Sequence, residues 1–109
     1  MVVLAVASQC LHFQLTIASP AGSLYGGMVP RGSTYLFGED ICAQFCHRNN
    51  VEMIARSHQL TMEGYEYMFD KKLVTIWSTP NYRGRCGNSG AIMEVDERLR
   101  KQFLVVPPL

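Results

Sequence analysis

Four groups of residues have types and spacings suited to chemistry, and the first two are single side chains. Arg31 stands between Pro30 and Gly32, a loop-like context in which a guanidinium could bind a phosphate through two parallel hydrogen bonds. His58 follows the strand-like run VEMIAR, and a neutral imidazole at a strand end can bind a metal ion. Each has an ordinary alternative: a solvated surface arginine and a structural histidine.

The third group is a loop between two strand-like runs, one ending at Ser78 and the other beginning at Ala91. It combines three glycines with the side chains of Asn81, Tyr82, Arg83, Arg85, Cys86 and Asn88. Glycines let a backbone approach a ligand closely, and the polar side chains could line a phosphate-containing site. An ordinary connecting loop with a solvated basic tip fits the same residues, so both interpretations stay open.

The fourth group contains Cys42, Cys46 and His47. The two cysteines are four positions apart and would share one face of a helix. With Cys86 or His12 they could begin a zinc site. A structural zinc site usually combines two closely spaced pairs of ligands, and only one such pair is present. Their apolar neighbours instead favour two small core residues.

The elements that would position these residues begin with one helix. The sequence predicts a helix over about 41–48, with Asp40 as its N-cap and Asn49 or Asn50 at its end. This helix would present the two cysteines on its buried face.

Runs rich in β-forming residues follow the helix. Strands are expected over 51–56, 72–78, 91–95 and 102–106. Residues 1–18 show no regular period, and residues 19–34 are rich in Gly, Pro and Ser and indicate a loop. One helix followed by several strands predicts an α+β fold or half of a β-sandwich.

Composition narrows the class of protein. A chain of 109 residues holds at most one domain, and 48% hydrophobic residues are too many for a disordered chain. The net charge of +1 gives no basis for binding nucleic acid or an anionic membrane. No apolar run is long enough for a membrane span. The four cysteines form no close CxxC pair, which indicates reduced thiols in a cytoplasmic or nuclear protein.

Four stretches resemble, in order and spacing, the motifs of the PPP serine/threonine phosphatases: PRGSTYLFGEDI, ARSHQLTMEGYE, LVTIWSTPNYRGRCGN and GAIMEVDERL. The tract YRGRCGN followed by AIMEVDE is most similar to the phosphatase-2A-like branch, which includes phosphatases 4 and 6. The resemblance identifies residues 29–109 as the C-terminal part of a catalytic domain. It implies an incomplete calcineurin-like metallophosphoesterase β-sandwich flanked by helices. Residues 1–28 do not match and are expected to be an irregular or mispredicted segment.

The resemblance implies hydrolysis of phosphoserine and phosphothreonine esters by a hydroxide that bridges two divalent metal ions (manganese, iron or zinc). It assigns His58 as one metal ligand, and Arg31 and Tyr82 as contacts to the phosphate. The loop containing Asn81, Arg83, Arg85, Cys86 and Asn88 would border the active site. The implied partners are phosphoprotein substrates and scaffold or regulatory phosphatase subunits.

The sequence also departs from the family pattern. Thr34 stands where the family has Gly, Ser57 where it has Ala, and Arg83 where the branch has Cys. The last change adds bulk and charge at the rim of the site and removes the attachment point of covalent toxin inhibitors. The motifs GDxHG, GDxxDRG and GNHE and the histidine of HGG, which carry the other metal ligands and the general acid, do not occur. We therefore expect the isolated chain to be inactive. We also expect it to be poorly soluble, because the other strands of the family's sandwich would be missing, which leaves unpaired strand edges and an uncovered apolar face.

Two other functions fit the sequence. The chain could be a non-catalytic interaction module, or decoy, that binds phosphatase regulatory subunits or substrates. It could also be a small zinc-binding domain built on Cys42 and Cys46.

Overall fold

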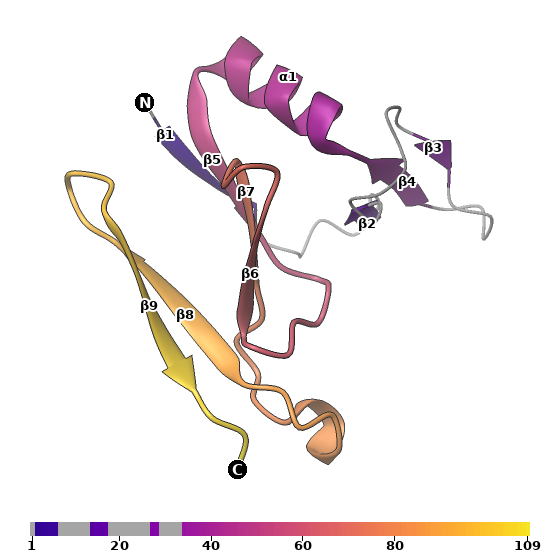
Figure 1. Cartoon of the computed structure of the whole chain (residues 1–109), viewed down its shortest axis with the longest axis vertical. Helices are drawn as coiled ribbons and strands as arrows, with labels where there is room; N and C mark the ends of the chain where they lie inside the picture. The colour runs from indigo at the N-terminus through magenta and orange to yellow at the C-terminus, as the bar shows by residue number, and fades with distance from the viewer. Residues whose placement is uncertain (1, 7–13, 18–26, 29–33) are drawn as a thin grey trace.

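The computed structural model describes residues 2–6, 14–17, 27–28 and 34–109 (Figure 1). Its elements in chain order are β1 (Val2–Val6), β2 (Gln14–Ile17), β3 (Gly27–Met28), β4 (Thr34–Phe37), α1 (Glu39–Asn49), β5 (Val51–Arg56), β6 (Tyr65–Met68), β7 (Leu73–Ile76), the 3-10 turn η1 (Tyr82–Gly84), β8 (Gly90–Val95) and β9 (Lys101–Val106). The structure is therefore mixed α+β, as the sequence predicts.

A four-stranded sheet with the order β1-β5-β7-β6 forms the centre of the molecule. β1, β5 and β7 run parallel to one another, and β6 pairs antiparallel with β7 at one edge. The register places Val6 beside Arg56, and Arg56 beside Thr75. The carboxyl ends of the three parallel strands therefore meet at one end of the sheet, which is the lower end in Figure 1.

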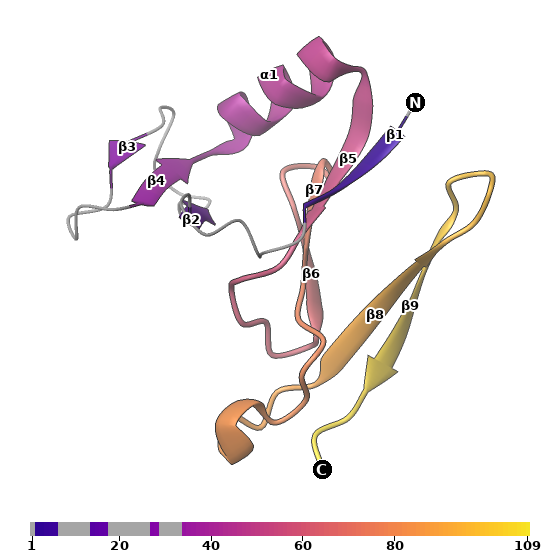
Figure 2. The same ribbon diagram turned by 180° about the vertical axis from the view of Figure 1, so that it is seen from behind.

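Two smaller sheets complete the described structure. In the first, β4 lies between β2, to which it is parallel, and β3, to which it is antiparallel. The second is the antiparallel hairpin β8–β9, which stands apart from the central sheet in both ribbon views (Figures 1 and 2). Thr34 is the first residue of β4 and pairs with Gln14. A β-branched residue suits that position.

Helix α1 differs at its start from the sequence prediction. Its N-cap is Gly38, with extended backbone angles and no side-chain cap, so the prediction of Asp40 as N-cap is wrong. Asp40 lies instead in the first turn, where a carboxylate interacts favourably with the helix dipole. The predicted end is confirmed: Asn50 is the C-cap in the left-handed conformation. Within the described residues, no helix is long and apolar enough to cross a membrane.

The core consists of two clusters on the two faces of the central sheet. Cys42 and Cys46 of α1 pack with Leu73 of β7. The second cluster contains Met53, Ala55 and Val74, and its half-buried members include Tyr65 of β6 and Phe103 of β9. Because neighbouring residues of a strand point to opposite faces, α1 covers one face of the sheet and the hairpin packs against the other.

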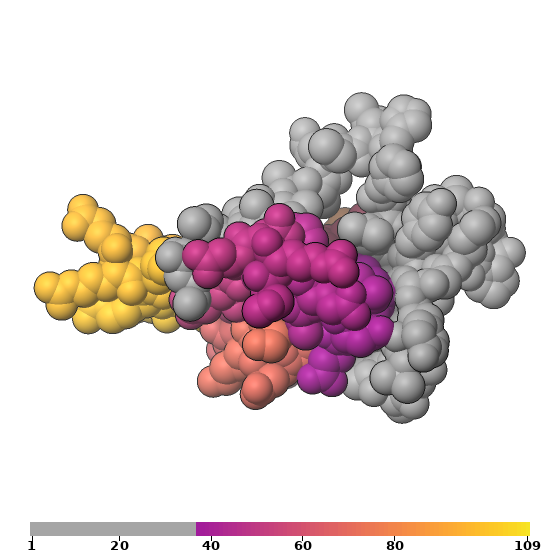
Figure 3. All heavy atoms as spheres, turned by 90° about the horizontal axis from the view of Figure 1, so that it is seen from above, coloured from indigo at the N-terminus to yellow at the C-terminus, as the bar shows by residue number. Residues whose placement is uncertain are grey.

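The hairpin makes this second contact mainly through aromatic stacking. The rings of Tyr65 and Phe103 lie parallel with centroids 3.8 Å apart. Lys101 Nζ also lies 2.5 Å from Glu52 Oε1 of β5. At the base of the hairpin, Ala91 is fully buried and its N donates to Trp77 O at 2.8 Å. Farther out, Ile92 and Leu104 are exposed, and β9, drawn in yellow, projects to one side of the molecule in Figure 3.

The predicted strands after the helix are confirmed as β5, β7, β8 and β9, with small differences at their ends. The prediction of no regular element in residues 1–18 is wrong, because β1 and β2 lie there. The predicted loop over 19–34 contains β3 and the first residue of β4. Strand β6 was not predicted.

Candidate active site

The candidate site lies where the parallel strands end. The segment that follows β5 carries His58, and the segment that follows β7 carries Tyr82. Both leave the same end of the central sheet, on the lower side of Figures 1 and 2. Open sheets with parallel strands commonly bind ligands outside these carboxyl ends. The topology therefore brings together two segments that are distant in the sequence.

His58 is exposed and has an unusual backbone conformation, with φ at 89°. A non-glycine residue in this region is strained, and such strain is often found at functional sites. No cluster of three or more His, Cys, Asp or Glu side chains that could hold a metal ion occurs among the described residues. His58 can thus offer one imidazole to a metal ion, but the described part of the chain supplies no complete set of ligands.

Arg56, just before this histidine, anchors the start of the loop. Its side chain is only 9% exposed and donates hydrogen bonds to Gln59 Oε1 at 2.7 Å and Thr75 Oγ1 at 3.4 Å. Burial lowers the pKa of the Arg56 guanidinium, because a charged group loses solvation in the protein interior. These contacts connect the loop that follows β5 with the neighbouring strand, β7.

Backbone hydrogen bonds connect the two segments directly. Ser89 N donates to Met62 O at 2.9 Å, and Trp77 N donates to Gly64 O at 2.8 Å. Gly64 has φ at +86°, and a Cβ atom there would lie 2.7 Å from the carbonyl carbon of Gly90. Only glycine allows this approach. The segments carrying His58 and Tyr82 are therefore held together as one unit.

Asn88 organises the loop that follows β7. Its side chain is fully buried and makes three hydrogen bonds: Oδ1 accepts from Tyr82 N at 2.8 Å, and Nδ2 donates to Thr79 O and Ser89 O at 2.9 Å each. Its own carbonyl accepts from Asn81 N at 2.8 Å. Asn88 thus lies in the loop that the sequence singles out, but its side chain holds the loop rather than facing a ligand.

Tyr82 is half-buried at the start of η1. Its ring contacts Trp77 edge-to-face, with centroids 4.9 Å apart at 88°. The residues on either side of it have left-handed backbones, with φ at 44° for Asn81 and 57° for Arg83. Two left-handed residues and the hydrogen bonds of Asn88 fix the backbone of the loop at Tyr82, and therefore the direction of its side chain.

The remaining residues of the predicted site differ in exposure and in their contacts. Arg83 and Arg85 are exposed, and Cys86 is half-buried. Asn81 uses its side chain within the protein, accepting from Gly87 N at 3.2 Å and donating to Leu109 O at 3.1 Å. Arg31 lies outside the described residues. The structure therefore brings the His58 segment and the Tyr82 loop together and leaves Arg31 as a prediction from the sequence.

Cys42 and Cys46 lie in the hydrophobic core, 1% and 5% exposed, which confirms the interpretation as small core residues. Desolvation raises the pKa of the Cys42 thiol to about 12, with a further contribution from Cys46. Its Sγ lies 3.9 Å from Lys72 O. A thiol in this environment stays protonated and is a poor metal ligand.

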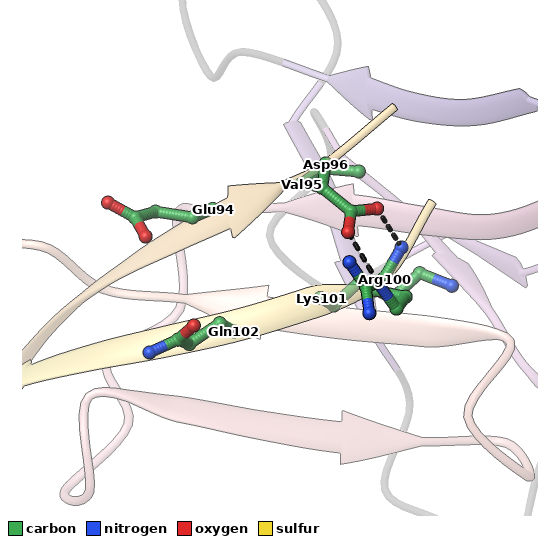
Figure 4. Close-up of a pocket in the computed structure, with 6 residues that line it drawn as sticks. All are labelled: Glu94, Val95, Asp96, Arg100, Lys101 and Gln102. Atoms are coloured by element: carbon green, nitrogen blue, oxygen red, sulfur yellow. Dashed lines mark hydrogen bonds and ion pairs between the residues drawn. The ribbon is translucent and has the colours of Figure 1, made fainter. Parts of the chain in front are cut away.

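A hollow at the tip of the hairpin is separate from the candidate site. It is lined by Glu94, Val95, Asp96, Arg100, Lys101 and Gln102 (Figure 4). Arg100 Nε lies 2.5 Å from Asp96 Oδ2, and Lys101 pairs with Glu52. Its cationic groups therefore already contact carboxylates, and the hollow lies at the far end of β8 from the Tyr82 loop (Figure 1).

The sequence interpretation missed three residues that shape the site. Trp77 supports the Tyr82 ring, Gly64 allows the close approach of the two segments, and Arg56 anchors the loop of His58. A signal existed for Trp77, the single tryptophan of the chain, because it stands directly before the loop. The role of Gly64 depends on a contact with Gly90 that sequence spacing does not reveal.

No family model matches the sequence. The structure is similar to that of a protein serine/threonine phosphatase from Saccharomyces cerevisiae, described as having similarity to human phosphatase PP5. The TM-score is 0.72, and the two chains are 26% identical. The chain resembles a serine/threonine phosphatase. The similarity covers 87% of this chain and 32% of the yeast chain, so this chain spans about a third of that phosphatase. Because residues 29–109 make up less than 87% of the chain, the similarity also includes some of the first 28 residues.

Proposed function

We propose that the chain is the C-terminal part of the catalytic domain of a serine/threonine protein phosphatase. The structural similarity over 87% of the chain, at a TM-score of 0.72, is the observation that carries this proposal. The four motifs starting at PRGSTYLF and ending at AIMEVDERL support it independently. We further assign the chain to the phosphatase-2A-like branch with a calcineurin-like fold, on the strength of YRGRCGN followed by AIMEVDE.

In this proposal three residues act on the phosphoester. His58 offers an imidazole at the carboxyl end of β5, Tyr82 faces the phosphate from the loop after β7, and Arg31 clamps the phosphate oxygens. The hydrogen bonds from Ser89 to Met62 and from Trp77 to Gly64 support a common site for the first two. The substrates are phosphoproteins, and the protein acts in the cytoplasm or nucleus.

The metal ions that the family uses do not fit the described residues alone. A divalent ion needs several protein ligands to compete with water, and the described part of the chain contains no group of three ligand side chains. When bound, two metal ions would supply an activated water for attack on phosphorus. We therefore propose that the isolated chain does not hydrolyse phosphoesters and that the other ligands must come from elsewhere.

A graft tests the proposal. The segment of the yeast phosphatase that matches residues 29–109 is replaced by those residues, and phosphate release from a phosphothreonine peptide is measured with manganese. We expect the graft to release phosphate and the isolated chain of 109 residues to release none. A graft that melts cooperatively but has no activity contradicts the family assignment. Turnover by the isolated chain that His58→Ala abolishes contradicts the proposed inactivity.

The hairpin favours a second candidate, the non-catalytic interaction module. Ile92 and Leu104 face each other across the two strands and are 51% and 45% exposed, and Val106 on the same face is 38% exposed. An uncovered apolar face of this kind favours contact with another polypeptide, such as a phosphatase subunit, or self-association. Light scattering tests this: we expect the isolated chain to associate and Leu104→Glu to reduce the association. A monomer of the unaltered chain contradicts it.

A further inference from the structure

Within the part of the chain that the structure describes, two arginines of the Tyr82 loop have no carboxylate partner. Arg83 and Arg85, called here the arginine rim, are both exposed. Among the described residues, Arg100 pairs with Asp96 and Lys101 pairs with Glu52. All Asp and Glu residues of the chain lie at or after position 39, within the described part. The rim therefore keeps its guanidinium groups available for an external anion.

The backbone places one residue of this rim, Arg83, beside Tyr82. Arg83 has φ 57° and ψ 20° inside η1, so its side chain leaves the loop in a direction that a right-handed residue would not give. Its guanidinium carbon lies 5.3 Å from the centre of the Tyr82 ring, within the range of a cation–π contact. Asn88, fully buried, holds the backbone of the loop. The positive charge thus lies beside the residue proposed to face the phosphate.

The chemistry of the rim selects for an acidic group. A guanidinium binds carboxylate or phosphate with two parallel hydrogen bonds, and two arginines two positions apart can bind neighbouring anionic groups. Nucleic acid would require a longer basic surface, and the net charge of the chain is only +1. The loop can also hydrogen-bond a polypeptide oxygen, since the side chain of Asn81 donates to Leu109 O at 3.1 Å.

We propose that the arginine rim selects phosphoprotein segments with Asp or Glu close to the phosphorylated residue. This inference rests on the proposed phosphatase function and adds a substrate preference to the same site. Arg83 stands where similar phosphatases have Cys, so the preference would be a property of this chain.

Four labelled peptides test the preference by fluorescence anisotropy with the full chain of 109 residues. They carry either phosphoserine or serine, flanked by either Glu or the uncharged Gln of nearly equal shape. Two exposed ion pairs should strengthen binding of the Glu peptides by about 2- to 30-fold over the Gln peptides. The difference should shrink as salt increases, because screening weakens exposed pairs.

Substitutions of the two arginines test whether they cause the preference for Glu peptides. The double substitution Arg83→Glu with Arg85→Glu should abolish or reverse the preference, and Arg83→Gln with Arg85→Gln should abolish it. Arg98→Glu is the control, since Arg98 is also exposed but lies at the tip of the hairpin. Trp77 fluorescence checks that each variant keeps its loop structure. Equal affinity for Glu and Gln peptides, or equal loss in the Arg98 control, overturns the inference.

The design separates this inference from the proposed function. If Glu peptides bind more tightly than Gln peptides but phosphorylation does not increase the affinity, the result supports the arginine rim and contradicts a phosphate site beside it. If phosphopeptides bind more tightly but Glu and Gln peptides bind equally, the result supports the phosphate site and overturns the inference about the arginine rim. An RNA oligonucleotide that binds more tightly than the Glu peptides also overturns it, because the rim would then serve a nucleic acid.

Discussion

Replacing Asn88 by alanine should release the loop that positions Tyr82. The side chain of Asn88 accepts one hydrogen bond from Tyr82 N and donates two, to Thr79 O and Ser89 O. The substitution removes all three and leaves a cavity at a fully buried position. Water can reach exposed Thr79 and, in part, the two other groups, which limits the penalty.

The expected magnitude follows from these three bonds. A typical intramolecular hydrogen bond contributes about 1 kcal/mol, and an unsatisfied buried group costs about 1–3 kcal/mol. We therefore expect Asn88→Ala to lower the free energy of unfolding by about 2–4 kcal/mol. Asn88→Asp should destabilise at least as much, because a carboxylate oxygen would then face the carbonyls of Thr79 and Ser89.

Urea denaturation, followed by the fluorescence of Trp77, measures the change. Trp77 is the single tryptophan and contacts Tyr82, so its emission reports on the loop. Asn49→Ala is the matched control: the side chain of Asn49 is exposed and donates a hydrogen bond to Phe45 O at 2.9 Å, so the substitution should change stability by less than about 1 kcal/mol. Equal effects of the Asn88→Ala and Asn49→Ala substitutions would refute the role given to Asn88.

Three further predictions concern the close approach at Gly64 and the burial of Cys42. Gly64→Ala should lower the urea midpoint more than Gly84→Ala does, because both glycines have positive φ but only the Cβ at Gly64 would meet neighbouring backbone; equal shifts would argue against the close approach. Cys42 should react with iodoacetamide far more slowly than half-buried Cys86, as judged by mass spectrometry of the labelled peptides. Since its pKa rises from 9.0 to about 12 on folding, the thiol's contribution to stability should be complete below pH 9 and lost as pH rises toward 12. A stability that stays level across this pH window would contradict the assigned burial.

The sequence predicts the second half of the fold well because its strands are bounded by clear signals. β5 begins after Asn50, whose left-handed C-cap ends the helix, and β9 ends before two prolines. The first half gives weaker signals. VVLAV is a continuous apolar run, which is typical of a buried parallel strand but lacks the alternation that identifies a strand by itself.

The site was only partly predictable for a related reason. His58, Tyr82 and the loop residues stand out by their types, but their common location depends on the parallel order of β5 and β7. The internal role of Asn88 and the need for glycine at Gly64 depend on contacts between segments. Neither can be obtained from spacing along the chain.

The most direct test of the central claim compares two histidines in the phosphatase graft. His58 lies at the candidate site, and His47 is exposed in the last turn of α1. We predict that His58→Ala lowers kcat/KM for a phosphothreonine peptide by more than about 100-fold. Loss of a residue that only supports a metal ligand costs at most about 100-fold, so a larger loss indicates a direct ligand. We predict that His47→Ala leaves kcat/KM unchanged. Full activity of the His58→Ala graft would contradict the account.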